Sequence, residues 1–247
     1  MSTGAEELAS RDDLSARRVG RLTYSDALGL QAETAELRLA GQIPDTLLLL
    51  EHDPVYTHGR RAAESELPMG AEWYLRQGIE VAETDRGGQV TYHGPGQLVA
   101  YPIIDLSGRE DDVHRYVREL EQTMAASLGR MGVEAGTVTG LTGVWTGEAD
   151  FLGSSSERPE VQAAVVEGAL RKIGSIGVHV SRSVTTHGFS LNVECDLQPF
   201  QWIVPCGIEG CKATSVLVET GETPGMEAAF SIVEEEFTRI FAPGARD

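Results

Sequence analysis

Residues 86–97 constrain the fold more than any other segment, because they hold five glycines or prolines within twelve positions. Glycine lets the backbone adopt positive φ and approach a bound group closely, and Pro95 fixes one corner. We therefore expect a loop between two strands, at 79–84 and 97–106, that presents N–H groups and polar side chains to a ligand. The segment lacks the GxGxxG order of a dinucleotide fingerprint and the Lys-Ser/Thr ending of a P-loop. On spacing alone, a Gly-rich hairpin without a ligand explains it equally well.

The composition predicts a single cytoplasmic domain. The chain has 247 residues, 41% of them hydrophobic, and no Pro/Ser-rich linker divides it. We expect a disordered N-terminal tail over 1–18 and one domain over 19–247. No apolar run approaches membrane-spanning length, and the first residues lack the basic and apolar regions of a secretion signal. Three cysteines, an odd number, indicate free thiols in a reducing compartment.

The charge pattern excludes one class of partner and draws attention to two residues. A net charge of −18 argues against binding of nucleic acid, whose phosphates would be repelled. The chain has only two lysines, Lys172 and Lys212, beside eighteen arginines. A lysine amine can lose its proton and act as a base, whereas a guanidinium cannot. Two lysines could also occur by chance, so this observation only supports a position chosen on other grounds.

Hydrophobic periodicity predicts an α+β fold, in which a mixed β-sheet has helices packed on one side. Between the strand at 141–146 and Lys172 lies an exposed extension over 147–165, which we expect to be a long hairpin. Helices are expected at 25–40, 70–77, 111–132 and 227–241, and strands at 47–50, 79–84, 97–106, 133–138, 141–146, 161–167, 172–180 and 188–193.

Several separated motifs resemble those of the lipoate-protein ligase B family, the octanoyl-[acyl-carrier-protein]:protein N-octanoyltransferases. The segment 86–106 is similar to the signature of that family. The resemblance covers roughly residues 20 to 240, and its motifs follow one another in the family's order. It implies the fold of the biotin/lipoyl protein ligase catalytic domain, and the extension is longer than the usual family hairpin. The further matching segments are 52–60, 143–145, 172–173, 186–188 and 205–208.

Cys206 has the setting of a nucleophile, since Pro205 fixes the chain before the thiol and Gly207 leaves room for a substrate carbonyl. A thiol needs a base or a positive neighbour to ionise, and Lys172 opens an alternating run that a sheet would half bury. The resemblance assigns Cys206 and Lys172 as the catalytic dyad. For an arbitrary cysteine and lysine, a buried small side chain and a snorkelling amine would be the better interpretation.

The resemblance implies a two-step transfer, the first step of endogenous protein lipoylation. Cys206 takes an octanoyl (or lipoyl) group from acyl carrier protein as a thioester, and the ε-amine of a lysine on a lipoyl domain then attacks it. Lys172 accepts and returns the protons. A tunnel that holds roughly six methylenes, at about 0.8 kcal/mol each, would supply on the order of 5 kcal/mol. No cofactor, metal, nucleic acid or membrane is expected, and the protein is expected to be a monomer.

Most of the substrate-binding residues are assigned by the same resemblance. The segment 175–177, together with Gly207 and Ile208, is instead chosen because its backbone N–H groups could stabilise an oxyanion. Among the histidines, His179 is expected to be structural, while His93 and His187 are as well placed to line the pocket as to be structural. A zinc site from His187, Cys195, Cys206 and Cys211 would lack paired CxxC spacing. The binding residues are Arg86, Gly87, Gly88, Gln89, Val90, Thr91, Tyr92, His93, Ser175, Ile176, Gly177, Gly188, Phe189 and Ser190.

Both protein substrates are expected to be acidic, so the entrance of this acidic enzyme must be locally basic. The candidates for such a patch are Arg60, Arg61, Arg171, Arg182 and Lys212. The sequence is also compatible with two other functions. The first is an ATP-dependent lipoate or biotin ligase, which needs no nucleophilic cysteine. The second is a silent carrier-binding module, or an amidotransferase that moves lipoyl groups between proteins.

Overall fold

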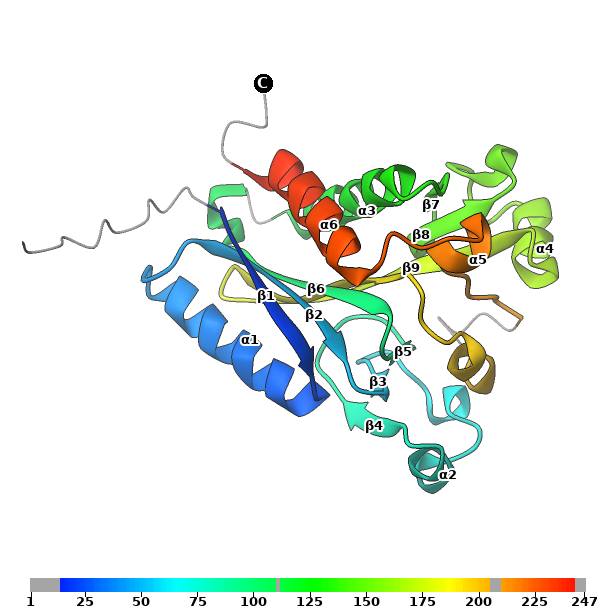
Figure 1. The fold of residues 1–247 in the computed structure, drawn as a ribbon, viewed down its shortest axis with the longest axis horizontal. Coiled ribbons are helices and arrows are strands. Elements are labelled where there is room, and N and C mark those ends of the chain that lie inside the picture. The colour runs from blue at the N-terminus through cyan, green and yellow to red at the C-terminus, as the bar shows by residue number, and fades with distance from the viewer. Residues whose placement is uncertain (1–13, 110–111, 205–209, 243–247) are drawn as a thin grey trace, which may run out of the picture.

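Two sheets form the framework of the protein in the computed structural model, which describes residues 14–109, 112–204 and 210–242 (Figure 1). In the larger sheet only β1 and β2 pair in parallel, so the predicted α+β class with a mixed sheet is confirmed. Its seven strands are, in spatial order, β1 (Leu14–Leu22), β2 (Asp45–His52), β6 (Gln97–Ile103), β10 (Val184–Asn192), β9 (Leu170–Ser181), β8 (Leu141–Gly147) and β7 (Gly136–Val138). The smaller sheet has the order β4 (Glu80–Glu83), β3 (Val55–His58) and β5 (Val90–His93).

Helices cover both faces of the larger sheet. The helices α3 (Val113–Arg130) and α6 (Met226–Phe241) lie on one face, and α1 (Tyr24–Leu39) lies on the other. The apolar run of β2 explains this arrangement, because Leu47 and Leu49 join the core with α3 and α6 while Leu48 and Leu50 pack toward α1. A strand that is apolar on both faces needs cover on both. The expectation of helices on one side therefore holds for α3 and α6 and is corrected for α1.

The remaining helices are short. The predicted helix near 70–77 is α2 (Ala71–Arg76), and α5 (Val216–Thr220) was not predicted. Asp112 caps α3 by accepting a hydrogen bond from the Arg115 N–H, which fixes the start of a helix that borders the site. Within the described residues, no helix has the length and apolar character needed to cross a bilayer. Turns of 3₁₀ helix lie at Glu64–Glu66, Leu106–Arg109, Ala149–Phe151 and Gln198–Trp202.

The structure corrects several predicted segments. Residues 14–18, which were expected to belong to a disordered tail over 1–18, form part of the edge strand β1, and residues 1–13 lie outside the described residues. The charges that made this segment look irregular suit an edge strand, where Arg18 reaches Glu227 and Glu234 of α6.

The extension near 147–165 is not a hairpin, and the strand expected at 161–167 is the helix α4 (Pro159–Glu167). Pro159 lies in the first turn and Gly168 ends the helix in a left-handed conformation, with φ of 83°. Similarly, the segment expected as a loop over 86–97 contains the strand β5.

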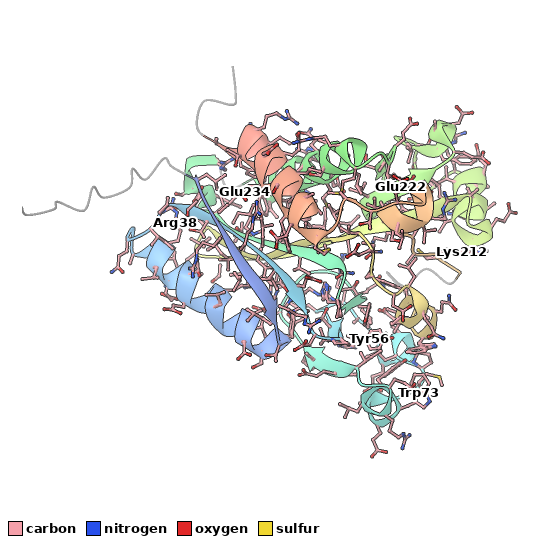
Figure 2. All side chains as sticks on the ribbon, viewed as in Figure 1. Arg38, Tyr56, Trp73, Lys212, Glu222 and Glu234 are labelled. Carbon is pink, nitrogen blue, oxygen red and sulfur yellow. The ribbon has the colours of Figure 1, made fainter. Side chains whose placement is uncertain are left out.

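The smaller sheet carries an aromatic cluster with α2 (Figure 2). Tyr56 and Tyr74 pack edge to face at 4.8 Å, and Trp73 packs edge to face against Trp202 at 5.1 Å. The Tyr56 hydroxyl donates to the Pro199 carbonyl at 2.6 Å. The cluster therefore fixes the chain just before residues 205–209, which lie outside the described residues.

Candidate active site

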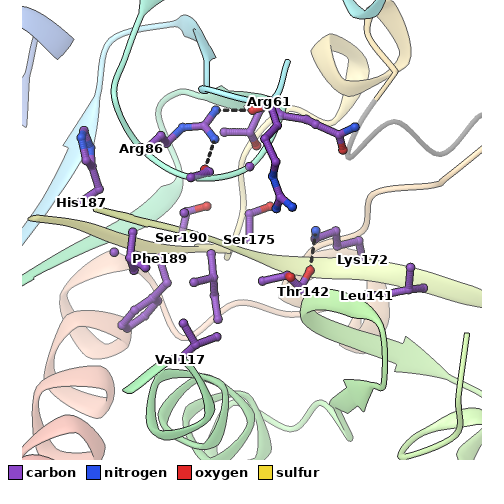
Figure 3. Close-up of a pocket in the computed structure, with 18 of the residues that line it drawn as sticks. Arg61, Arg86, Val117, Leu141, Thr142, Lys172, Ser175, His187, Phe189 and Ser190 are labelled. Carbon is purple, nitrogen blue, oxygen red and sulfur yellow. Dashed lines mark hydrogen bonds between the residues drawn. The ribbon is translucent and has the colours of Figure 1, made fainter. Parts of the chain in front are cut away.

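A cavity of about 790 Å³ lies between the β9–β10 pair, the segment 86–93 and the first turns of α3 (Figure 3). Its wall combines apolar side chains with a few polar groups, as is usual for a site that holds a small organic group. From α3 come Val113, His114, Val117 and Arg118. The other lining residues are Tyr24, Arg61, Arg86, Gly87, Gly88, Gln89, Val90, Thr91, His93, Tyr101, Gly140, Leu141, Thr142, Trp145, Lys172, Ser175, Ile176, Gly177, Val178, His187, Gly188, Phe189 and Ser190.

Lys172 occupies one end of the cavity, with only 7% of its surface exposed. Its Nζ donates to the Thr142 carbonyl at 2.9 Å and lies 5.4 Å from the centre of the Trp145 ring. The β8–β9 pairing shifts register here, so that Val144 faces Gly174 while Trp145 faces Lys172. A bulge of this kind re-aims a side chain. It explains how Lys172 and Ser175, three residues apart, both line the cavity.

The chain that follows residues 205–209 returns to Lys172. The Lys172 N–H donates to the Lys212 carbonyl at 2.8 Å, and the Thr214 N–H donates to the Lys172 carbonyl at 2.9 Å. Cys206, the predicted nucleophile, lies outside the described residues.

The segment 86–88 forms a roof over β9. The Gly87 N–H donates to the Val178 carbonyl at 2.9 Å, and a Cβ added at Gly177 would lie 2.8 Å from the Gly87 carbonyl oxygen. Arg86 holds the roof in place, because its Nη2 donates to the carbonyls of Thr57 at 2.6 Å and Gln89 at 2.7 Å. Gly177 is thus required because the backbone of Gly87 approaches it closely. The Arg86 guanidinium both lines the cavity and stabilises the segment 86–88 through its hydrogen bonds.

His187 lies at the end of the cavity opposite Lys172 (Figure 3), with a backbone φ of 56° that is unusual for a residue other than glycine. Its N–H donates to Gln31 Oε1 at 2.6 Å, and its Nε2 lies 2.8 Å from Asp85 Oδ1. Burial lowers the pKa of His187, although Asp85 acts in the opposite direction. Burial alone would raise the pKa of Asp85, but the bond to His187 and the charges of His187 and His179 lower it.

Neutral histidines and tyrosines enclose this end. The Tyr101 hydroxyl donates to His52 Nε2 at 2.7 Å, and His52 Nδ1 donates to the Leu22 carbonyl at 3.2 Å. Burial lowers the pKa of His52 to about 4 and the pKa of His93 well below its usual value. His93 Nδ1 lies 2.6 Å from Gln97 Oε1. At neutral pH His52, His93 and Tyr101 are therefore hydrogen-bonded groups without charge.

The structure brings together every described residue of the predicted binding set except Tyr92. Side chains alternate along a strand, so Thr91 and His93 of β5 face the cavity while Tyr92 faces the aromatic cluster. Tyr92 packs against Tyr56 at 5.5 Å and Phe200 at 5.4 Å. Its place in the predicted acyl pocket is therefore corrected.

A model of the lipoyl protein ligase A/B catalytic domain matches residues 23–238. An octanoyltransferase of Solibacter usitatus is 45% identical over 226 residues, which are 92% of this chain and 90% of that protein. One of Mycolicibacterium smegmatis is 47% identical over 205 residues, or 83% of this chain and 79% of that protein. The chain belongs to the octanoyltransferase family.

Solved structures add independent support for the fold. A lipoate protein ligase of Thermoplasma acidophilum, solved with bound lipoic acid, superposes with a TM-score of 0.64 over 92% of this chain and 84% of that one, at 16% identity. A lipoate-protein ligase A bound with ATP superposes with a TM-score of 0.63 at 17% identity, over 92% of this chain and 84% of that chain. At such identities the likeness supports the octanoyltransferase fold and carries no residue role.

Several lining residues of this octanoyltransferase were not predicted from its sequence. Thr142 accepts the Lys172 hydrogen bond through its backbone carbonyl, and a backbone contact leaves no signal in the residue type. Tyr24 and Val117 lie on helices whose apolar stripes predict burial without telling which residues border a cavity. Among the described residues, no group of three or more His, Cys, Asp or Glu side chains could hold a metal ion. Cys195 is buried, and burial raises the pKa of its thiol to about 12.

Proposed function

We propose that this octanoyltransferase takes an octanoyl group from acyl carrier protein onto Cys206 and passes it to a lysine amine of a lipoyl domain. The observation that carries the proposal is the buried Lys172 amine at one end of the 790 Å³ cavity. An amine in this position can exchange protons with a neighbouring thiol. The return of the chain at Lys212 to the Lys172 backbone supports a place for Cys206 near that amine.

The two half-reactions use the same groups in opposite directions. Lys172 accepts the proton of the Cys206 thiol, and the thiolate attacks the thioester carbonyl of the donor. The tetrahedral intermediate expels the carrier thiolate, which receives that proton from Lys172. The lysine amine of the acceptor then attacks the acyl-enzyme, loses its proton to Lys172, and releases Cys206 as thiolate. Oxyanion stabilisation by the 175–177 segment, with Gly207 and Ile208, belongs to this proposal.

The cavity wall supports binding of an acyl chain. Val117 of α3 and Ile176 and Phe189 of the β9–β10 pair offer apolar surface to the cavity. At about 0.8 kcal/mol per buried methylene, the tail supplies several kcal/mol of binding. The roof at 86–88 is held by backbone hydrogen bonds, so the space for the chain exists before the substrate arrives.

The docking patch for the two acidic proteins differs from the one expected. Arg171 and Arg182 lie at opposite ends of β9, roughly 36 Å apart at about 3.3 Å per residue, and they pair with Glu219 and Glu36. They cannot form one patch at the entrance. Arg61 and Arg118 border the cavity itself, and we propose that these two receive the carrier and the lipoyl domain.

The acceptor class draws support from one solved relative, a bipartite lipoate protein ligase from Thermoplasma acidophilum that was studied with its E2 lipoyl domain. That protein superposes over 92% of this chain with a TM-score of 0.65 at 15% identity. We propose that the present enzyme acts as a cytoplasmic monomer and needs no cofactor.

The deciding experiment is the intact mass of the protein after mixing with octanoyl-acyl carrier protein in the absence of ATP. We expect an octanoyl increment on the wild type that hydroxylamine removes, and much less of it on Lys172→Met. Cys206→Ser should show no hydroxylamine-labile increment. An unmodified wild type with a competent donor contradicts the thioester mechanism. Acylation of the acceptor only when ATP and free octanoate are supplied would instead support a ligase.

A further inference from the structure

The Lys172 amine contacts the peptide group between Thr142 and Gly143. The carbonyl of this group accepts a hydrogen bond from Lys172 Nζ at 2.9 Å. Its N–H, on Gly143, donates to Glu121 Oε1 at 3.4 Å. The chain has no cis peptide bonds within the described residues, and in a trans peptide the C=O and N–H point in opposite directions. The amine and the carboxylate therefore lie on opposite sides of a single peptide group.

Residue 143 must be glycine for the peptide to contact the Lys172 amine. Its φ is 105°, a conformation that residues with a Cβ rarely adopt. A Cβ built there would lie 2.9 Å from Lys172 Cε and 3.3 Å from its Nζ. The peptide can approach the amine this closely only because residue 143 is glycine.

Glu121 is an unusual residue to find at this place. It lies in the middle of α3, partly buried, and burial raises its pKa, while the Gly143 N–H and the charges of Arg118 and Lys172 act in the opposite direction. Its neighbour Glu119 instead pairs with Arg109 and Arg115 on another side of the helix. A carboxylate that accepts from an N–H polarises the peptide and strengthens the acceptor at its carbonyl.

We propose that Glu121 is a positioning residue for Lys172, acting through the peptide group between Thr142 and Gly143. The carboxylate fixes the orientation of that peptide, and the carbonyl in turn fixes the amine at the end of the cavity. Glu121 does not touch the reacting atoms. The inference rests on the proposed function, because it gives Glu121 a role only if Lys172 exchanges protons during acyl transfer.

The first test measures Lys172 itself and needs no reaction. The chain has two lysines, so labelling of the lysine Cε with ¹³C gives two side-chain signals, which Lys212→Arg assigns. In the wild type we expect the two ε-protons of Lys172 to be inequivalent, because the amine is held. Glu121→Ala should make them nearly equivalent, and Glu121→Gln, which keeps an acceptor oxygen but no charge, should give an intermediate result. Glu119→Gln is the matched control on the same helix and should leave the Lys172 signals as they are.

The second test measures transfer. The hydrogen bond is long, so we expect Glu121→Gln to lower kcat only roughly tenfold, with KM for the octanoyl carrier protein unchanged. Glu121→Ala should lower kcat further, and Glu119→Gln should not. Unchanged Lys172 signals and a wild-type kcat in both Glu121 variants would overturn the inference while leaving the proposed function intact. If the wild type itself forms no acyl-enzyme, the proposed function fails, and the Lys172 signals still report whether Glu121 holds the amine.

Discussion

The two ends of the cavity are built on different principles. At one end, the Lys172 amine is held by a backbone carbonyl, beside a register shift in the sheet and a glycine at positive φ. At the other, His52, His93 and Tyr101 are neutral, buried groups that satisfy one another's hydrogen bonds or those of nearby side chains and backbone. The amine proposed to exchange protons and the groups that enclose the cavity thus lie at opposite ends of one strand pair. Changes at the first end should affect chemistry, and changes at the second should affect binding and stability.

The largest expected effect is at Lys172. Lys172→Met removes the only proposed proton acceptor, and Lys172→Arg keeps the charge but cannot give up a proton. We expect both to lower the rate of acyl-enzyme formation by roughly a thousandfold. Rapid mixing with octanoyl-acyl carrier protein and acid quench gives that rate, and thermal unfolding checks that both variants fold. An Arg variant with substantial activity would mean that the positive charge alone is needed.

Gly143→Ala should have the next largest effect. A Cβ at this position meets the Gly174 carbonyl oxygen at 2.5 Å and displaces the Lys172 side chain, and positive φ adds about 1–3 kcal/mol of strain. We expect roughly a hundredfold loss of kcat. Gly153→Ala is the matched control, since Gly153 also has positive φ, of 78°, but a Cβ there meets nothing within 4 Å. If the two variants lose activity equally, strain rather than contact with Lys172 is responsible.

Gly177→Ala tests the roof. The added Cβ would lie 2.8 Å from the Gly87 carbonyl oxygen, so the segment 86–88 must lift from β9. We expect kcat/KM for the octanoyl donor to fall roughly tenfold, mainly through KM, because uniform binding is lost while Lys172 stays in place. Gly108→Ala, where a Cβ meets nothing within 4 Å, is the control. A fall in kcat alone would show that the roof also shapes the reactive end.

The smallest effect concerns stability and pH. The pKa of folded His52 is about 4, below its usual value, so the unfolded chain binds a proton first as the pH falls below about 6.5. The stabilisation from neutral His52 is complete above that pH and is lost between about 6.5 and 4, at up to about 1.4 kcal/mol per pH unit.

We expect denaturant titrations to show this slope in the wild type and a shallower one in His52→Gln. His93 and His187, whose pKa values are also lowered, supply the remainder. A wild-type slope in His52→Gln would mean that His52 is not the group that titrates.

The strand that holds Lys172 was predicted correctly from the sequence, whereas the strand β1 and the helix α4 were not. Lys172 opens a segment in which residues alternate as they do in a half-buried strand, so the sequence predicts a strand there. The motif residues around Lys172 are adjacent in the sequence. The strand β1 was missed because its arginines resemble a solvated tail, although they pair with α6 across the sheet edge. The helix α4 was missed because a short apolar run fits a strand as well, while Pro159 and Gly168 carried the correct signal.

Glu121 shows what a single sequence cannot reveal. On a helix, a glutamate followed by polar residues predicts an exposed side chain, and Gln122 and Thr123 follow Glu121 in α3. Its contact with Gly143 depends on how α3 lies across β8, which is decided by the packing of the whole core. Tyr92 illustrates the reverse error, because the family motif suggested a contact that the alternation of β5 excludes.

The strand β9 runs from Lys172, at the proposed reactive end, to Val178, whose carbonyl accepts a hydrogen bond from the segment 86–88. Six steps of about 3.3 Å make this span roughly 20 Å. The spacing between the two ends of the cavity therefore depends on the length of the β9 backbone, and side chains close each end. A substitution can change the width, the polarity or the end walls of the cavity, whereas an insertion or deletion in β9 and its partner β10 would change the spacing between the ends. Such a change would also turn every following side chain to the opposite face of the sheet unless it came in pairs of residues.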